Sequence, residues 1–171
     1  MKEKVIVFPQ YNNEEVPIRL YDENIEEVII NYIRGAKKEI CIAMAWFTSD
    51  ILMNELKAVK KKGVNIKLII SNDQYNNKNK LEAVCSKLKA VVIPKRKNVT
   101  WNNLMHNKYC IIDNKKVIDG SYNWSKNAKY NLEHIIVIES MKVSNMYKNS
   151  FEKIYNNPEY YVEYNIYSEL A

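Results

Sequence analysis

Short hydrophobic runs alternate with amphipathic segments through the first half of the chain. Mainly apolar runs at Val5–Phe8, Glu39–Phe47 and Val64–Ile70 predict strands, because they are short and rich in β-prone residues. Between them, apolar residues recur every three or four positions, which predicts one helix ending at about Gly35 and a second ending at Gly63. Alternating strands and helices are typical of an α/β layered domain.

Both predicted helices begin after residues that can cap them. The side chains able to accept from free backbone N–H groups are Asp22 or Asn24 before the first helix and Thr48, Ser49 or Asp50 before the second. The apolar positions expected to face the core are Ile25, Val28, Ile29, Tyr32 and Ile33, then Ile51, Leu52, Leu56 and Val59. Gly63 stands where a left-handed residue commonly ends a helix.

The second half of the chain is richer in strands. The elements predicted there are a helix within residues 76–90, strands at Val91–Ile93, Leu104–Ile112, Lys116–Asp119 and Glu133–Glu139, and a helix at Ser144–Tyr155. The last three strands are close together in sequence, so we expect them to be neighbours in one sheet. The pattern as a whole predicts an α/β fold with a mixed β-sheet flanked by helices.

No linker or low-complexity tract divides the sequence, so residues 1–171 are expected to form a single domain, with a Tyr-rich tail over 158–171 of unclear structure. The longest apolar run, Ile40–Phe47, is too short to span a bilayer. The first residues lack the features of a signal peptide. These features favour a cytoplasmic protein without a stable membrane anchor.

The scarcity of cysteine, histidine and glycine excludes several kinds of site. The three cysteines, Cys41, Cys85 and Cys110, lie in apolar segments and are expected to be reduced core thiols. With no Cys-x-x-Cys pair and two histidines, a zinc site is not expected. The sequence has three glycines and lacks the Gly-rich loops of nucleotide-binding proteins. We therefore expect no metal and no cofactor.

The net charge of +6 is unevenly distributed along the chain. Residues 56–130 carry 17 basic and 4 acidic groups, a net charge of +13, whereas residues 1–55 have a net charge of −4 and residues 131–171 of −3. A strongly positive segment favours a polyanionic partner such as nucleic acid or anionic lipid. The alternative is that these lysines only solvate the outer faces of helices.

One polar pattern interrupts the basic segment, His106-x-Lys108 followed by Ser121-x-Asn123. Alternate residues of a strand point to the same side, so His106 and Lys108 are expected to lie side by side. An imidazole and an ammonium next to small polar donors suit a phosphate group. Taken singly, these residues also have structural explanations, such as a core histidine or a turn at Asp113.

The full pattern, His-x-Lys-x4-Asp-x6-Gly-Ser-x-Asn, resembles the signature of the phospholipase D superfamily. The segment Ala36–Ile70 and the later Asn131-Leu-Glu133 are similar to the small nuclease branch with a single motif, and the similarity spans roughly residues 20–140. The resemblance implies an α/β/α layered fold, with a motif region over residues 104–139, and a phosphodiesterase that needs no metal.

The resemblance also implies a role for each motif residue. His106 would attack phosphorus and form a phosphohistidine, while Lys108 and Asn123 would hold the phosphate oxygens. Ser121 and Glu133 would lie close behind, with Glu133 a candidate to orient the imidazole. Asp113 falls after the predicted strand, and its implied role is more structural than chemical.

A single motif leaves the reaction without a general acid for the leaving alkoxide. The second histidine, His134, adjoins Glu133 on a predicted strand and should point to the opposite face. Single-motif members of the family are similar in pairing two copies. We therefore expect a homodimer whose shared site contains His106, Lys108 and Asn123 from each chain.

Residues before the motif are candidates for substrate binding. Lys95, Arg96 and Lys97 form a basic loop that could follow a phosphate backbone, and Trp101 could stack on a base or simply pack in the core. The leading hypothesis is a nuclease that acts on DNA or RNA. The alternatives are a lipid phosphodiesterase that cleaves phospholipid or cardiolipin, and a non-catalytic nucleic-acid-binding module.

Overall fold

The computed structural model describes residues 16–93 and 103–160. The predicted strand Val5–Phe8 and the residues of the 158–171 tail beyond 160 lie outside these ranges, as do the basic loop Lys95–Lys97 and Trp101.

The described residues contain one seven-stranded mixed sheet with the order β1-β7-β6-β5-β2-β3-β4. The strands are β1 (Ile18–Tyr21), β2 (Glu39–Met44), β3 (Asn65–Ser71), β4 (Lys87–Val91), β5 (Lys108–Ile112), β6 (Lys116–Gly120) and β7 (Ile135–Glu139). Strands β2, β3 and β4 pair in parallel. The other neighbours pair antiparallel, and β5, β6 and β7 are adjacent as predicted.

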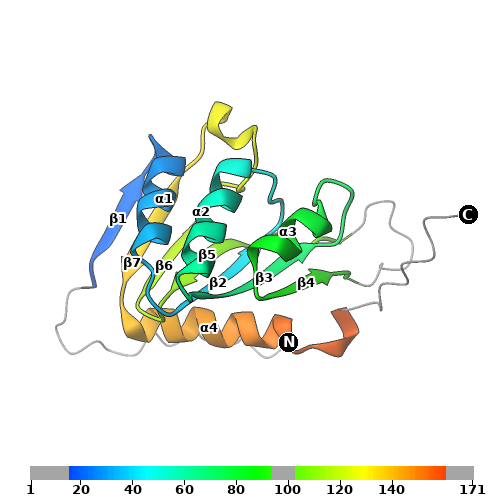
Figure 1. The fold of residues 1–171 in the computed structure, drawn as a ribbon. Helices are drawn as coiled ribbons and strands as arrows, with labels where there is room; N and C mark the ends of the chain where they lie inside the picture. Colours follow the sequence, from blue (N-terminus) through cyan, green and yellow to red (C-terminus); the bar gives the residue numbers. More distant parts are fainter. Residues whose placement is uncertain (1–15, 94–102, 161–171) are drawn as a thin grey trace, which may run out of the picture.

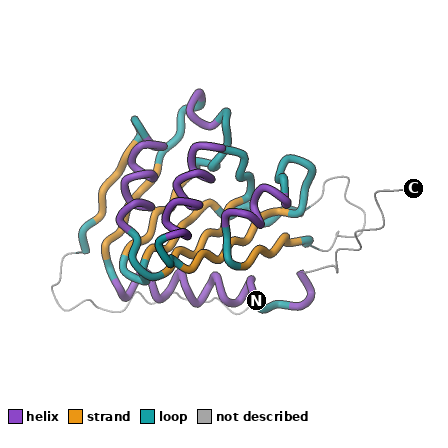
Figure 2. The backbone as a smooth tube through the Cα atoms, viewed as in Figure 1, coloured by secondary structure: helices purple, strands orange, loops and turns teal. Residues whose placement is uncertain are grey.

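Helices cover both faces of the sheet (Figure 1). Three helices lie on one face: α1 (Ile25–Gly35), α2 (Asp50–Lys61) and α3 (Lys78–Val84). Helix α4 (Met141–Tyr155) runs along the other face. Short 3₁₀ turns occur at Ala128–Tyr130 and Pro158–Tyr160. The strands thus form a middle layer between helices (Figure 2), which confirms the predicted α/β/α architecture.

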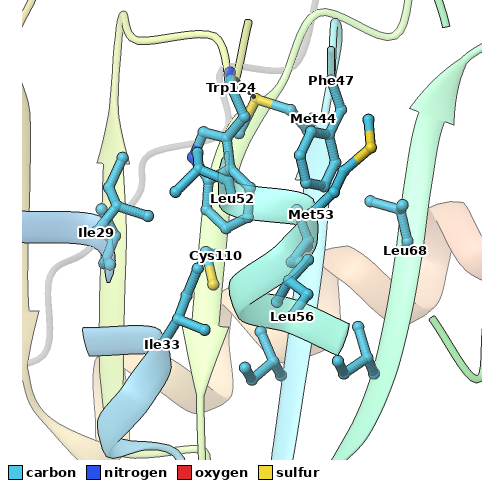
Figure 3. Close-up of a cluster of buried hydrophobic side chains, with 14 of the residues drawn as sticks. Ile29, Ile33, Met44, Phe47, Leu52, Met53, Leu56, Leu68, Cys110 and Trp124 are labelled. Carbon is cyan, nitrogen blue, oxygen red and sulfur yellow. Dashed lines mark hydrogen bonds between the residues drawn. The ribbon is translucent and has the colours of Figure 1, made fainter. Parts of the chain in front are cut away.

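The larger core lies between the sheet and the first three helices. Figure 3 shows side chains of α1 and α2, such as Ile33 and Leu56, packed toward strand side chains such as Met44 of β2 and Cys110 of β5. All four are at most 1% exposed, so their apolar surface is withdrawn from water almost completely. A smaller core lies under α4, where Phe151 and Tyr155 stack with ring centroids 5.6 Å apart.

The helix predictions hold for α1 and α2 with local exceptions. Ser49 caps α2 by accepting from the Leu52 N–H, and Gly63 has a φ of 92°, as expected for a left-handed stop. Asn24 occupies the N-cap position of α1 but makes no side-chain cap hydrogen bond, since its own backbone is left-handed. Ile51 was expected in the core but is half exposed, because Met53 takes the inward position instead.

Several strand boundaries differ from the predictions. The strand expected at Val91–Ile93 is instead β4, which starts at Lys87 and ends at Val91, and helix α3 ends at Val84. The lysines of β4 alternate with apolar residues, so the segment fits a strand beside β3 better than a helix extending to Ala90. The edge strand β1 was not predicted; it pairs with β7 through the main chain while its own side chains are mostly exposed.

The three cysteines are free and buried, as predicted. Burial raises the pKa of Cys41 and of Cys85 to about 11, so both remain protonated at neutral pH. Within the described ranges, no helix combines the length and apolarity needed to cross a membrane.

The topology brings several strand ends to one edge of the sheet. The carboxyl ends of β2 and β3 lie there, and antiparallel pairing adds the start of β5, the end of β6 and the start of β7. Loops at the carboxyl ends of parallel strands are where α/β folds commonly place their sites. This end of the sheet carries His106, Lys108, Ser121 and Asn123, whereas the motif residue Asp113 follows the opposite end of β5.

Candidate active site

His106 and Lys108 are in contact at the start of β5. The Lys108 Nζ lies 3.2 Å from each imidazole nitrogen of His106 and donates to the His106 carbonyl oxygen at 3.0 Å. The expectation that both residues lie in one strand was wrong, since β5 begins at Lys108 and His106 belongs to the preceding loop. The two side chains still meet, because the Lys108 side chain turns back toward His106 and contacts both its ring and its carbonyl oxygen.

The environment of His106 favours its neutral form. Partial burial, and next the positive charge of Lys108, lower the pKa of His106 below its ordinary value. At neutral pH the ring therefore keeps an unprotonated nitrogen with a free electron pair. Burial also lowers the pKa of Lys108, while the carboxylates of Glu133 and Asp119 act in the opposite direction.

An aromatic ring closes one side of the histidine. Trp46 meets the imidazole edge-to-face, with ring centroids 5.6 Å apart, and its indole N–H donates to Asp73 at 2.7 Å. The strand before Trp46 ends at Met44 because Asn76 takes over the hydrogen bonds there. Its amide donates to the Ala45 and Ser71 carbonyls and accepts from the Phe47 N–H at 2.7, 2.8 and 2.8 Å. Sequence reasoning missed both Trp46 and Asn76, since neither stands in a recognisable pattern.

Asn123 is held at the same edge through its neighbour Trp124. The Trp124 carbonyl accepts from the N–H groups of Thr48 and Ser49 at 2.8 and 2.9 Å, and its buried ring packs edge-to-face on Phe47. The Asn123 side-chain oxygen is buried and has no hydrogen-bond partner. Buried amide oxygens usually accept a hydrogen bond, so the Asn123 side chain retains an unused acceptor.

Ser121 joins the end of β6 to the start of β7. Its hydroxyl accepts from the His134 N–H and its own N–H donates to the His134 carbonyl, both at 3.1 Å. The glycine before it is required by this close approach, because a Cβ at Gly120 would lie 2.2 Å from the His134 oxygen. The φ of Gly120 is not positive, so the close approach of the His134 backbone, and not a left-handed backbone angle, accounts for the glycine.

An open cleft of about 430 Å³ lies beside the histidine, between the strand ends and α4. Its lining includes His106, Lys108, Asp119 and Tyr147. The Tyr147 hydroxyl donates to Asp119 at 2.5 Å, and Asp119 also accepts from the Gly120 N–H at 2.8 Å. Sequence reasoning missed Asp119 and Tyr147. A carboxylate directly after the apolar pair Val117 and Ile118 was the available signal for Asp119, and Tyr147 on α4 had none.

Glu133 and His134 do not contact His106. Glu133 accepts from the Asn131 amide at 3.3 Å, and no hydrogen bond joins it to the imidazole within the described residues. The β7 strand begins at Ile135, so both residues lie in the loop before it rather than in a strand as predicted. The His134 side chain is exposed, and only its backbone takes part in the contacts with Ser121.

Asp113 lies at the far end of β5 from Lys108. Its carboxylate accepts from the backbone N–H groups of Lys37, Lys38 and Glu39 at 2.8, 2.7 and 3.0 Å. Burial alone would raise the pKa of Asp113, but these three hydrogen bonds lower it below its usual value. Asp113 therefore joins the end of β5 to the loop between α1 and β2. The predicted nucleic-acid contacts Lys95, Arg96, Lys97 and Trp101 lie outside the described residues.

The sequence matches the family described as "Cardiolipin synthase, PLD-like domain" over residues 29–155, about three quarters of its length. The chain belongs to the phospholipase D-like family. The resemblance read from the motif is thus confirmed, and the matched range contains every described residue of the candidate site.

Relatives of this phospholipase D-like chain include proteins named for lipid hydrolysis. It is 26% identical over 128 residues to a mitochondrial cardiolipin hydrolase of Chlamydomonas reinhardtii, covering 74% of this chain and 56% of that one. It is 30% identical over 120 residues to a phospholipase D of Rickettsia bellii, covering 70% and 58%. The chain spans a little over half the length of the curated relatives it matches.

Solved structures share the fold over nearly their whole length. NucT from Helicobacter pylori has a TM-score of 0.73 and 26% identity, covering 82% of this chain and 96% of its own. A phospholipase D family member, Nuc from Salmonella typhimurium, has a TM-score of 0.68 and 23% identity, covering 83% and 95%. At that identity the second likeness concerns the fold alone.

Proposed function

We propose that this chain is a phosphodiester hydrolase that cleaves DNA or RNA through covalent attack by His106. The observation that carries the proposal is the contact between a neutral imidazole and a cationic side chain at the open edge of the sheet. A neutral ring nitrogen is a competent nucleophile, and a cation beside it can hold a phosphate oxygen during the attack.

The proposed reaction has two steps. In the first, an imidazole nitrogen of His106 bonds to phosphorus, the bond to one ester oxygen breaks, and the departing alkoxide takes a proton from a general acid. In the second, water attacks the phosphohistidine, gives its proton to the same group acting as a base, and releases the histidine. Lys108 and the Asn123 amide stabilise charge on the non-bridging oxygens in both steps.

The general acid is proposed to be His106 of a second copy. The chain has one other histidine, His134, and its backbone is bonded to Ser121 while its side chain does not contact His106. A twofold axis beside the motif would bring two copies of His106 to one phosphate, with one as nucleophile and the other as acid and base. The reaction as proposed needs no metal, because Lys108 and Asn123 supply the stabilising groups.

Nucleic acid is the preferred substrate because of the charge distribution. Residues 56–130 carry a net charge of +13 and contain His106, Lys108 and Asn123. A polynucleotide carries a phosphate at every nucleotide, so its binding is strengthened more by this positive charge than the binding of a ligand with a single phosphate.

A lipid substrate is the second candidate. Its specific supports are the names of the curated relatives and two exposed apolar side chains in the β6–β7 connection. Tyr130 is 78% exposed and Leu132 is fully exposed, which would suit contact with a lipid surface.

Cleavage assays in EDTA separate these candidates. Plasmid, single-stranded DNA, RNA and vesicles of anionic phospholipid are each incubated with the wild type, His106→Ala and, as a matched control, His134→Ala. Cleavage of a nucleic acid that is lost in His106→Ala and kept in His134→Ala is the expected result. Turnover of phospholipid with no cleavage of any nucleic acid would replace the first candidate by the second.

A further inference from the structure

A second cleft lies next to the segment that holds Asn123, and carboxylates dominate its lining. Its volume is about 530 Å³, and it separates the start of α1 from the connection between β6 and β7. The acidic side chains among the lining residues are Asp22, Glu23, Glu26, Glu27 and Glu133. Lys129 is the basic residue among the described lining, so the cleft carries a formal net charge of −4.

The negative charge of this cleft is not neutralised within the described part of the chain. No ion pair there involves any of the five carboxylates, although surface acids elsewhere, such as Glu55 and Asp50, are paired. Glu26 accepts from the Ser49 hydroxyl at 2.9 Å and Glu133 accepts from the Asn131 amide, but both donors are neutral. Like charges gathered in a concave surface raise the local concentration of cations.

Tyr122 adds an observation of a different kind. It lines the cleft and is only 3% exposed, and its hydroxyl has no hydrogen-bond partner. Burial raises the pKa of Tyr122 to about 12, with further contributions from Glu26 and Glu133, so the hydroxyl is protonated at neutral pH. Buried hydroxyls are normally paired, and an unpaired one facing a group of carboxylates is suited to a ligand that donates N–H groups.

The arrangement of the acids favours an extended cation over a metal ion. No three His, Cys, Asp or Glu side chains among the described residues are grouped closely enough to hold a metal. Carboxylates distributed along a cleft of this size instead match a ligand whose positive charges are separated by flexible links.

We propose that this cleft binds a linear polyamine, with its ammonium groups against the carboxylates at the start of α1 and one N–H donated to the Tyr122 hydroxyl. Tyr122 stands between Ser121 and Asn123, so the bound cation would contact the same segment that presents the candidate catalytic amide. Binding requires no turnover, so this proposal can stand or fall separately from the nuclease activity.

Calorimetric titration of the full chain with spermidine tests the site directly. The variant Glu23→Gln/Glu27→Gln, in which both changed residues are exposed, should bind about fivefold more weakly. The matched control Glu82→Gln/Glu159→Gln removes the same charge from exposed positions outside the cleft and should stay within about twofold of the wild type. Lys129→Gln should bind more tightly, because it removes the opposing charge.

Tyr122→Phe separates a ligand role from a structural one. The substitution deletes a hydroxyl that makes no internal hydrogen bond, so the melting temperature should not fall, while affinity for spermidine should drop about threefold or more. Unchanged affinity in this variant would overturn the proposed contact. Equal weakening in the control variant, tighter binding of Mg²⁺ than of spermidine, or binding of an oligolysine peptide but not of spermidine would each overturn the polyamine site.

Discussion

At the scale of single residues, the contact between His106 and Lys108 links position to reactivity. The lysine lies within 3.2 Å of both ring nitrogens, and its charge and the partial burial of the ring act in the same direction on the pKa. A histidine that loses its proton more readily is a better nucleophile near neutral pH, because a larger fraction is unprotonated. In the proposed reaction the same lysine would hold a phosphate oxygen of the substrate.

The first prediction concerns the titration of this histidine. The pKa of His106 should lie below the ordinary value for histidine, and Lys108→Gln should raise it, because removing a neighbouring positive charge favours the protonated ring. Nuclear magnetic resonance of the ring protons against pH measures both values. An unchanged His106 titration in the variant would show that the lysine charge does not act on the ring.

A second prediction concerns Gly120, where an added methyl group meets the backbone of β7. Gly120→Ala should destabilise the fold by about 1–3 kcal/mol, since a Cβ would lie 2.2 Å from the His134 oxygen and 2.8 Å from the Ile135 Cα. Gly35→Ala is the matched control, because a Cβ there has nothing within 4 Å and the residue ends a helix. Urea unfolding of both variants measures the difference, and equal stabilities would refute the steric argument.

At the scale of elements, two polar side chains hold the ends of strands β2 and β5. Asn76 ends β2 by bonding to Ala45, Ser71 and Phe47, which frees the following residues to form the wall beside His106. Asp113 does the equivalent at the opposite edge, where it joins β5 to the loop before β2. Asn76 therefore holds the end of β2 beside the candidate site, while Asp113 holds the opposite end of β5.

The third prediction follows from the three hydrogen bonds to Asp113. Asp113→Ala should cost about 1–3 kcal/mol at neutral pH, because it leaves backbone N–H groups without their acceptor. The pKa of Asp113 is lowered in the fold, so its stabilising contribution is present above the ordinary aspartate range and is lost as pH falls through the folded value.

Urea unfolding across the acid range tests this prediction. The difference between the wild type and Asp113→Ala should shrink as pH falls, whereas the exposed control Glu82→Ala should differ little from the wild type throughout. A difference that does not change with pH would remove the charge of Asp113 from the explanation.

At the scale of the whole molecule, the presence of a single motif determines how many chains the proposed reaction needs. One chain provides one His106 at the open edge of the sheet, and the proposed two-step chemistry needs two imidazoles. The proposed reaction therefore requires a homodimer, because the second imidazole has to come from a second chain.

The fourth prediction tests the shared site by mixing chains. After subunit exchange, an equal mixture of wild type and His106→Ala at constant total protein should retain about a quarter of the wild-type activity, because about a quarter of random dimers contain two wild-type chains. Independent sites would leave about half. An equal mixture with His134→Ala serves as the control and should retain full activity, and the molar mass in solution should correspond to two chains.

The layered fold, helices α1 and α2, and the family could be predicted from the amino-acid sequence alone, because they depend on local periodicity and on a motif with fixed spacing. The sequence could not determine that β4 starts at Lys87 or that Ile51 faces solvent, since tertiary packing decides between nearly equal local patterns. The contact of Lys108 with both nitrogens of His106 also depends on the folded chain. The need for glycine at position 120 depends on it as well, because it comes from the backbone of His134 and Ile135, which lies close by only in the folded chain. The acidic cleft, with Tyr122 at its edge, exists only because folding brings the start of α1 against the segment after β6. These features depend on distances between parts of the chain that are remote in sequence, and only the tertiary structure sets such distances.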